Sequence, residues 1–230
     1  MRRLLHQPLD PRCRKIRLAL GEKKLAFALE VERPWDRRDE LLVLNPAATL
    51  PVLIEPDGVT IAGDGVIQEY LDEVYCDPDG GLVLLPGGPV ERAEARRIAC
   101  WFDEKFAEEV TASLVDEKIT RRFLPRDLGG GPPDIEAMRI GMHNVGYHLD
   151  YISFLAERRN WLAGDALTIA DLAAAAHLSC VDYLGNVPWT DFPHAKDWYM
   201  RIKSRPAFRA LLADTVPGMP AAQHYADLDF

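Results

Sequence analysis

The residues best suited to thiol chemistry lie at the start of a predicted helix. Asp10 is a typical N-cap residue, Pro11 is a typical first helical residue, and Cys13 falls on the first turn. A helix N-terminus and basic neighbours favour a thiolate, and positions 12, 14 and 15 are all Arg or Lys. Cys13 is therefore a candidate nucleophile or redox sensor, and a buried structural cysteine is the alternative.

Other site chemistries find little support in the sequence. The cysteines contain no Cys-x-x-Cys pair, which argues against thioredoxin-type exchange, a zinc site and a disulfide framework. His143 and His148 are five residues apart and fall on different helix faces, so we expect no metal site. The four cysteines are Cys13, Cys76, Cys100 and Cys180.

Composition limits the partners further. The chain has 230 residues and a net charge of −9, which makes nucleic acid an unsuitable partner. No apolar run is long enough to span a bilayer, and the first residues lack the apolar region of a signal peptide. We therefore expect a cytoplasmic protein with no membrane partner. The charge is uneven, because residues 39–85 hold ten acids and no base.

The N-terminal third reads as alternating strands and helices. Asn45 to Ile54 runs from a loop into a short apolar strand, and its Leu50-Pro51 bond is a cis candidate, with an ordinary trans loop as the alternative. Asp64 is the expected cap of the helix that follows. In order, we expect a strand over 2–6, a helix over 10–22, a strand over 27–32, a loop or short helix over 34–38, a hairpin over 51–62 and a helix from 64.

Helical signals dominate the rest of the chain. Ile98, Phe102, Phe106 and Val110 recur every four residues within an expected helix over 91–120. Thr168 and Asp171 have the spacing of a capping box at a helix start. Further helices are expected over 134–159, 194–205 and 206–213.

Several of these motifs together resemble the glutathione transferase superfamily. Residues 161–171 (WLAG…LTIAD) are similar to the capping motif of that family's sixth helix, and residues 192–208 end in its RPAF sequence. With Leu50 to Leu53 and Tyr70-Leu71, the resemblance covers residues 2–213. It implies a thioredoxin-like α/β domain over 1–79, a linker over 80–90, an all-helical domain over 91–213 and a tail over 214–230, usually in a twofold dimer.

The residues that would bind glutathione depart from the family pattern. The family presents backbone groups at the Leu50-Pro51 loop and activates the thiol with a hydroxyl or cysteine near the first helix. An ionised Asp10 cannot donate to a thiolate. Positions 63 and 64, typically Glu or Gln followed by Ser, are Gly63 and Asp64, and like charges at ~4 Å cost about 1 to 4 kcal/mol. Because residues 39–85 contain no base to offset Asp64, we expect a vestigial site that takes neither glutathione nor another cofactor.

Two surface segments are candidate partner-binding sites. Trp35, Arg37 and Arg38 join an aromatic to basic residues, a composition enriched in protein contacts, although Trp35 could equally pack on its own domain. The chain ends in alternating acidic and apolar residues, with Asp227, Leu228 and Phe230 as the expected contacts. A tail folded back over the helical domain is the alternative.

The resemblance is strongest to an alphaproteobacterial branch of the superfamily that binds the tubulin-like division protein FtsZ and supports curved, bundled filaments. It rests on the first six residues, the segment from Asp10 to Lys15, the Gly63-Asp64 pair and the last four residues. It implies a non-catalytic homodimer at the division site. The alternatives are an active transferase or lyase that uses Cys13 or an unrecognised donor, and a redox sensor built on Cys13.

Overall fold

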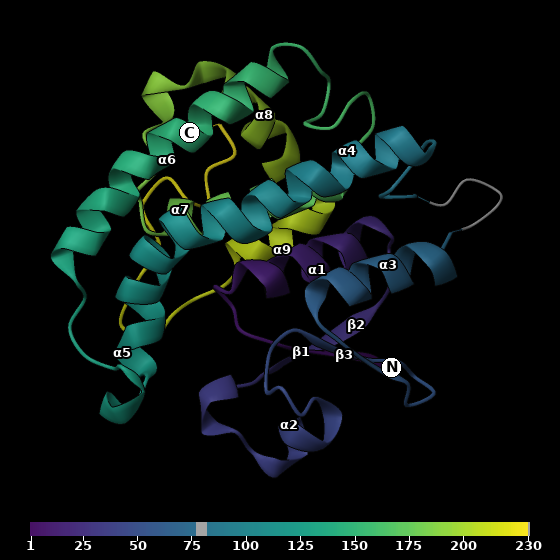
Figure 1. Ribbon diagram of the computed structural model, residues 1–230, viewed down its shortest axis with the longest axis vertical. Coiled ribbons are helices and arrows are strands. Elements are labelled where there is room, and N and C mark those ends of the chain that lie inside the picture. Colours follow the sequence, from purple (N-terminus) through teal and green to yellow (C-terminus); the bar gives the residue numbers. More distant parts are fainter. Residues whose placement is uncertain (77–81, 230) are drawn as a thin grey trace.

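A four-stranded mixed sheet forms the centre of the N-terminal domain (Figure 1). The computed structural model describes residues 1–76 and 82–229. The strand order is β2-β1-β3-β4, with β1 and β2 parallel and the other pairs antiparallel. The strands are β1 (Arg2–His6), β2 (Phe27–Val31), β3 (Val52–Ile54) and β4 (Thr60–Ala62).

Side chains alternate between two packed faces of this sheet. Leu4 joins the large core with α1 (Pro11–Glu22) and α3 (Asp64–Val74). Leu5 points to the opposite face and packs in a second cluster with Leu41 of α2 (Asp39–Leu44). Helix α2 was not predicted from the sequence, where residues 39–44 were left without a secondary-structure element. The short helix η1 (Pro34–Asp36) precedes α2.

The C-terminal domain is all-helical within the described residues. Residues Ile98, Phe102, Phe106 and Val110 are fully buried, as their spacing predicted. The helix that carries them continues beyond Cys100 with wider, π-type hydrogen bonding. The helices are α4 (Pro89–Cys100), η2 (Trp101–Thr120), α5 (Arg121–Phe123), η3 (Arg126–Leu128), α6 (Ile135–Ala156), α7 (Ile169–Tyr183), η4 (Trp189–Asp191), α8 (Pro193–Lys203), η5 (Pro206–Phe208) and α9 (Arg209–Leu212).

Helix α7 lies at the centre of the molecule and is buried along its whole length. It packs against α1, α4, η2 and α8, so the two domains share one core. The predicted capping box at its start is confirmed, because Asp171 accepts from the Thr168 N–H at 3.0 Å. The same carboxylate accepts from the Leu162 N–H at 2.9 Å and from Trp198 Nε1 at 3.0 Å, which ties three segments together. The expected fold class, a thioredoxin-like domain followed by a helical domain, is confirmed.

Neither a membrane-spanning helix nor a metal-binding cluster is found in the part of the chain that the structure describes. None of the helices in residues 1–76 and 82–229 is both long and apolar enough to cross a bilayer. The same part of the chain contains no group of three His, Cys, Asp or Glu side chains that could hold a metal ion. The linker predicted over 80–90 begins outside the described residues, and α4 starts within it at Pro89.

Candidate functional site

The candidate site begins where α1 starts. Asp10 is the N-cap, as predicted, and its Oδ1 accepts a hydrogen bond from the Cys13 N–H at 2.8 Å. Burial raises the pKa of Asp10, although this bond opposes the shift. The Asp10 carboxylate, which lies nearest the N-terminus of α1, is therefore a hydrogen-bond acceptor and is already bound to a backbone N–H of that helix.

Cys13 lies buried on the first turn of α1. Its side chain is fully buried beside Leu5 and Leu41, and its Sγ accepts from the Gln7 N–H at 3.5 Å. Burial raises the pKa of the Cys13 thiol well above its ordinary value, and the Asp10 charge adds to the increase. The expectation that basic neighbours favour a Cys13 thiolate was wrong, because a charge close in sequence counts only if its side chain faces the sulfur.

Two of the three neighbouring basic side chains point into the helical domain, and the third, Arg12, is exposed. Arg14 Nη1 donates to Ser179 Oγ at 2.8 Å, and Arg14 Nη2 donates to Asp214 Oδ2 at 2.9 Å. Lys15 Nζ donates to Asp103 Oδ2 at 2.5 Å. Both side chains are buried, so α1 uses these cations to join the two domains.

The loop opposite α1 keeps the family's backbone feature. The peptide bond between Leu50 and Pro51 is cis, which confirms the prediction. The Pro51 carbonyl accepts from the Gly63 N–H at 3.1 Å, so the loop is held against the start of α3.

The start of α3 differs from the expectation in two ways. The N-cap is Gly63, with φ of 90°, and Asp64 is the first helical residue and makes no side-chain cap. Its carboxylate instead pairs with Lys15, whose side chain is 4% exposed and which also binds Asp103. Burial alone would lower the pKa of Lys15, but Asp103 and Asp64 outweigh it and raise that pKa. The base that offsets Asp64 thus comes from α1, outside residues 39–85, and the assumption of an uncompensated charge was wrong.

This network fills the space between α1 and α3 with protein charges. Asp103 Oδ1 lies 3.6 Å from His177 Nε2, and His177 Nδ1 lies 2.8 Å from Thr111 Oγ1. Burial opposes ionisation of Asp103, yet His177 and Lys15 outweigh it and lower the pKa of this carboxyl. Asp64 thus takes part in an internal ion pair with Lys15, where the prediction expected an uncompensated charge. Sequence spacing did not indicate Asp103 or His177, and it assigned the charge of Lys15 to Cys13 and not to Asp64.

A cavity of about 280 Å³ adjoins Asp10 at the boundary between the domains. Its walls are largely apolar, and its charged residues are Asp10, Asp116 and Arg33. Partial loss of hydration raises the pKa of Asp116, and the nearby Asp10 adds to the shift. The apolar walls include Leu9, Val31, Trp35, Ile119, Phe123 and Val216. The shape and polarity of this cavity suit an apolar side chain or small molecule better than a charged tripeptide.

The structure brings part of the predicted surface segment to this cavity. Trp35 is half-buried and lines it, whereas Arg37 and Arg38 are exposed nearby. Arg37 has a positive φ of 44°. Arg38 Nε donates to Glu32 Oε1 at 3.1 Å, which lowers the pKa of the Glu32 carboxyl. Trp35 and Arg37 are thus the members of this segment that combine accessibility with no described ion pair.

The C-terminal segment is packed in its first part and exposed towards its end. Tyr225 is 1% exposed, and its hydroxyl accepts from Arg14 Nη1 at 3.0 Å. Asp214 at the start of the segment pairs with Arg14 and Arg17. Asp227 is exposed and Leu228 is half-buried, whereas Phe230 lies outside the described residues. Tyr225 was not among the predicted site residues, although it is the single large aromatic between the last helix and the final four residues.

Two family models match the chain. Residues 11–74 match the N-terminal domain of glutathione S-transferase, and residues 144–206 match its C-terminal domain. The first match covers α1, the cis-Pro loop and α3, and the second covers α7 and α8.

Similar proteins match over the full length of the chain. FtsZ-localized protein A of Caulobacter vibrioides is 47% identical, and the match covers 100% of this chain and 98% of that protein. The structure of FzlA from C. crescentus, 47% identical, superposes with a TM-score of 0.91 over 100% of this chain and 99% of that one. A glutathione S-transferase from Rhodospirillum rubrum F11, 50% identical, has a TM-score of 0.94 over 100% of both chains.

Proposed function

The chain belongs to the glutathione transferase superfamily, and on this premise we propose that it is a non-catalytic member that binds FtsZ. In this proposal it acts in the cytoplasm at the division site, where it promotes bundling and curvature of FtsZ filaments. The observation that carries the proposal is the full-length similarity to FtsZ-localized protein A, at 47% identity.

The geometry of the vestigial site supports a non-catalytic role. A transferase has to lower the pKa of the bound thiol with a donor at the start of α1. Asp10 accepts there, and Cys13 is buried with a raised pKa. The Asp64 carboxylate is engaged by Lys15, so neither group is free for the γ-glutamyl end of glutathione.

The proposed partner surface combines the cavity rim with the end of the tail. Trp35 offers a half-buried aromatic anchor, and Arg37 and Asp227 offer exposed charges of both signs. Interfaces typically place such an aromatic at the centre and charges at the rim, where they speed association. Leu228 and Phe230 complete the proposed contact.

A homodimer is part of the same proposal, because one docking site per molecule cannot join two filaments. Helix α6 supports it with three exposed apolar residues at seven-residue spacing. Ile140 is 49% exposed, Tyr147 58% and Phe154 52%. Seven residues are close to two helical turns, so these side chains lie on one face of α6. We propose that this face is covered by a second copy.

An active transferase is the second candidate, and two observations favour it. The cis-Pro loop is intact, and a relative 50% identical to this chain is a glutathione S-transferase. Co-sedimentation with polymerised FtsZ, run in parallel with glutathione conjugation of a generic electrophile, tests both candidates. We expect co-sedimentation that Trp35→Ala weakens and that the exposed control Arg92→Ala does not. Conjugation without co-sedimentation would overturn the proposal in favour of the enzyme.

A further inference from the structure

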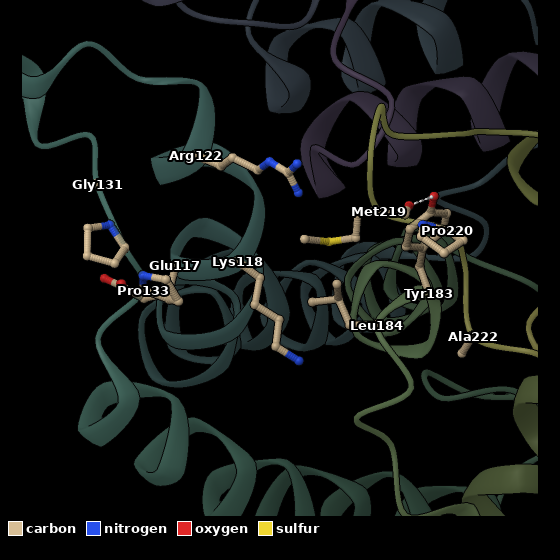
Figure 2. A pocket seen from close by; sticks show the side chains of 11 residues that line it. Glu117, Lys118, Arg122, Gly131, Pro133, Tyr183, Leu184, Met219, Pro220 and Ala222 are labelled. Carbon is tan, nitrogen blue, oxygen red and sulfur yellow. Dashed lines mark hydrogen bonds between the residues drawn. The ribbon is translucent and has the colours of Figure 1, made fainter.

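A second cavity lies on the opposite side of the helix end that borders the first. Asp116, Ile119 and Phe123 line the cavity at Trp35, whereas Lys118 and Arg122 face a groove of about 540 Å³ (Figure 2). The other wall of this groove comes from the end of α7 and from the tail. None of its lining residues belongs to the vestigial glutathione site.

Two cations of this groove have no carboxylate partner among the described residues. Lys118 Nζ donates to the amide oxygen of Asn186 at 2.7 Å. Arg122 Nη1 donates to the Gly218 carbonyl at 3.2 Å. Burial lowers the pKa of Lys118, as expected for an ammonium that lacks a counter-ion. In a chain with 36 acidic and 27 basic residues, two adjacent unpaired cations point to an anionic ligand.

The acidic residue in the groove does not neutralise them. Glu117 Oε1 accepts from Arg121 Nη1 at 2.9 Å, and Glu117 Oε2 accepts from the Asp134 N–H at 2.7 Å. Both carboxylate oxygens are therefore used within the protein, on the side of Glu117 that faces the loop before α6.

The facing wall is apolar and held in place. Leu184 and Met219 are half-buried and line it, together with Pro220. The buried Tyr183 fixes this part of the tail, since its hydroxyl donates to the Met219 carbonyl at 2.7 Å and its carbonyl accepts from the Ala222 N–H at 2.8 Å. The groove is thus preorganised, with charge on one side and apolar surface on the other.

We propose that this groove binds an acidic segment of a partner protein in extended conformation. Lys118 and Arg122 are four residues apart along one continuous helix and both line the groove. Acidic side chains two residues apart on a strand lie on the same side at about 6.7 Å, so one extended segment can present an acid to each cation. The intervening apolar side chains would face Leu184 and Met219. The ligand is therefore an acid-x-acid segment with apolar residues between the acids.

Fluorescence anisotropy with a labelled decapeptide that alternates Glu with Leu and Phe tests this site. We expect Lys118→Gln and Arg122→Gln each to weaken binding about tenfold, and the peptide with Gln in place of Glu to bind at least tenfold more weakly. Arg92→Gln removes an exposed charge on α4 and serves as the matched control, with unchanged affinity. Unchanged melting temperatures would show that the variants are folded.

Two results would overturn the proposal. The first is equal binding, or none, by the wild-type protein and the Lys118→Gln, Arg122→Gln double variant. The second is peptide binding that strengthens when residues 226–230 are deleted, because the occupant would then be the chain's own acidic tail. FtsZ co-sedimentation is measured separately, so failure of this proposal and failure of the proposed function give different results.

Discussion

Lys15 Nζ donates a 2.5 Å hydrogen bond to Asp103 Oδ2, and this buried pair joins α1 of the sheet domain to η2 of the helical domain. Lys15 is 4% exposed, and removal of one partner from a buried pair leaves the other charge uncompensated. Lys15→Met should therefore lower the free energy of unfolding by about 3 kcal/mol. Urea titration measures it, with the exposed Arg12→Met as the control on the same helix. Equal stability of the two variants would contradict a structural role for the pair.

Stability should fall as the pH is lowered from about 6.5 to about 4, because His148 stays neutral in the fold. Burial lowers the pKa of His148 to about 4, and Trp101 Nε1 donates to its Nδ1 at 3.0 Å. Below the ordinary pKa of 6.5 the imidazole of His148 binds a proton in the unfolded chain but not in the folded protein. The free energy of unfolding therefore decreases by up to about 1.4 kcal/mol for each pH unit. Burial likewise lowers the pKa of His6 to about 4, which adds to the slope.

Unfolding titrations at several pH values check this expectation. Gln at position 148 can still accept from Trp101 and donate to Glu109, but it cannot titrate. In His148→Gln, the slope of the free energy of unfolding against pH should therefore decrease by the amount that one bound proton contributes. The exposed His143→Gln is the matched control for the substitution itself. If His148→Gln has the same slope as the wild-type protein, a group other than His148 causes the pH dependence of stability.

The two parts of the tail should separate stability from partner binding. Tyr225 is buried, so Tyr225→Ala should cost about 3 kcal/mol of unfolding free energy. Asp227 is exposed, so Asp227→Lys should leave the melting temperature nearly unchanged while it abolishes or greatly weakens FtsZ co-sedimentation. Retained co-sedimentation in Asp227→Lys, and on deletion of residues 228–230, would show that the tail end is not a contact.

Glutathione affinity should respond to the ion pair at α3. Asp64→Ser removes one carboxylate from Lys15 and leaves its ammonium able to attract the γ-glutamyl carboxylate. We expect calorimetry to show negligible binding by the wild-type protein and a gain of tenfold or more for Asp64→Ser. Gly63→Glu restores the family's acid but places a side chain at φ of 90°, so it should destabilise the fold and add less affinity. Micromolar binding by the wild-type protein would refute the proposal that the glutathione site is vestigial.

The oligomeric state should depend on the exposed face of α6. Light scattering should give twice the chain mass of 25.8 kDa, and Tyr147→Lys with Phe154→Lys should give a monomer. Ile135 is 70% exposed near the start of α6 and off this face, so Ile135→Lys is the control. A wild-type monomer at micromolar concentration would count against the dimer.

The sequence predicted several features that depend on neighbouring residues, although not the start of α3, where Gly63 and not Asp64 is the N-cap. The N-cap at Asp10, the Thr168 capping box and the cis bond before Pro51 involve residues at most three apart, and each is confirmed. Contacts between side chains far apart in the sequence could not be predicted, because they depend on the direction in which each side chain points. Lys15 meets partners 49 and 88 residues away, and its flexible stem could have reached solvent equally well. The same limitation explains the Cys13 error, because the flanking cations were counted by sequence position and not by direction.

Asp171 accepts from Thr168 three residues away and from Trp198 27 residues away, so one carboxylate closes a very short loop and a long one. The short loop costs little chain entropy, whereas the longer one becomes favourable only after part of the domain has collapsed. Helix initiation at Thr168 would therefore present the Asp171 acceptor before α8 packs against it. We expect α7 to form first in this half of the molecule and the indole of Trp198 to dock onto it later.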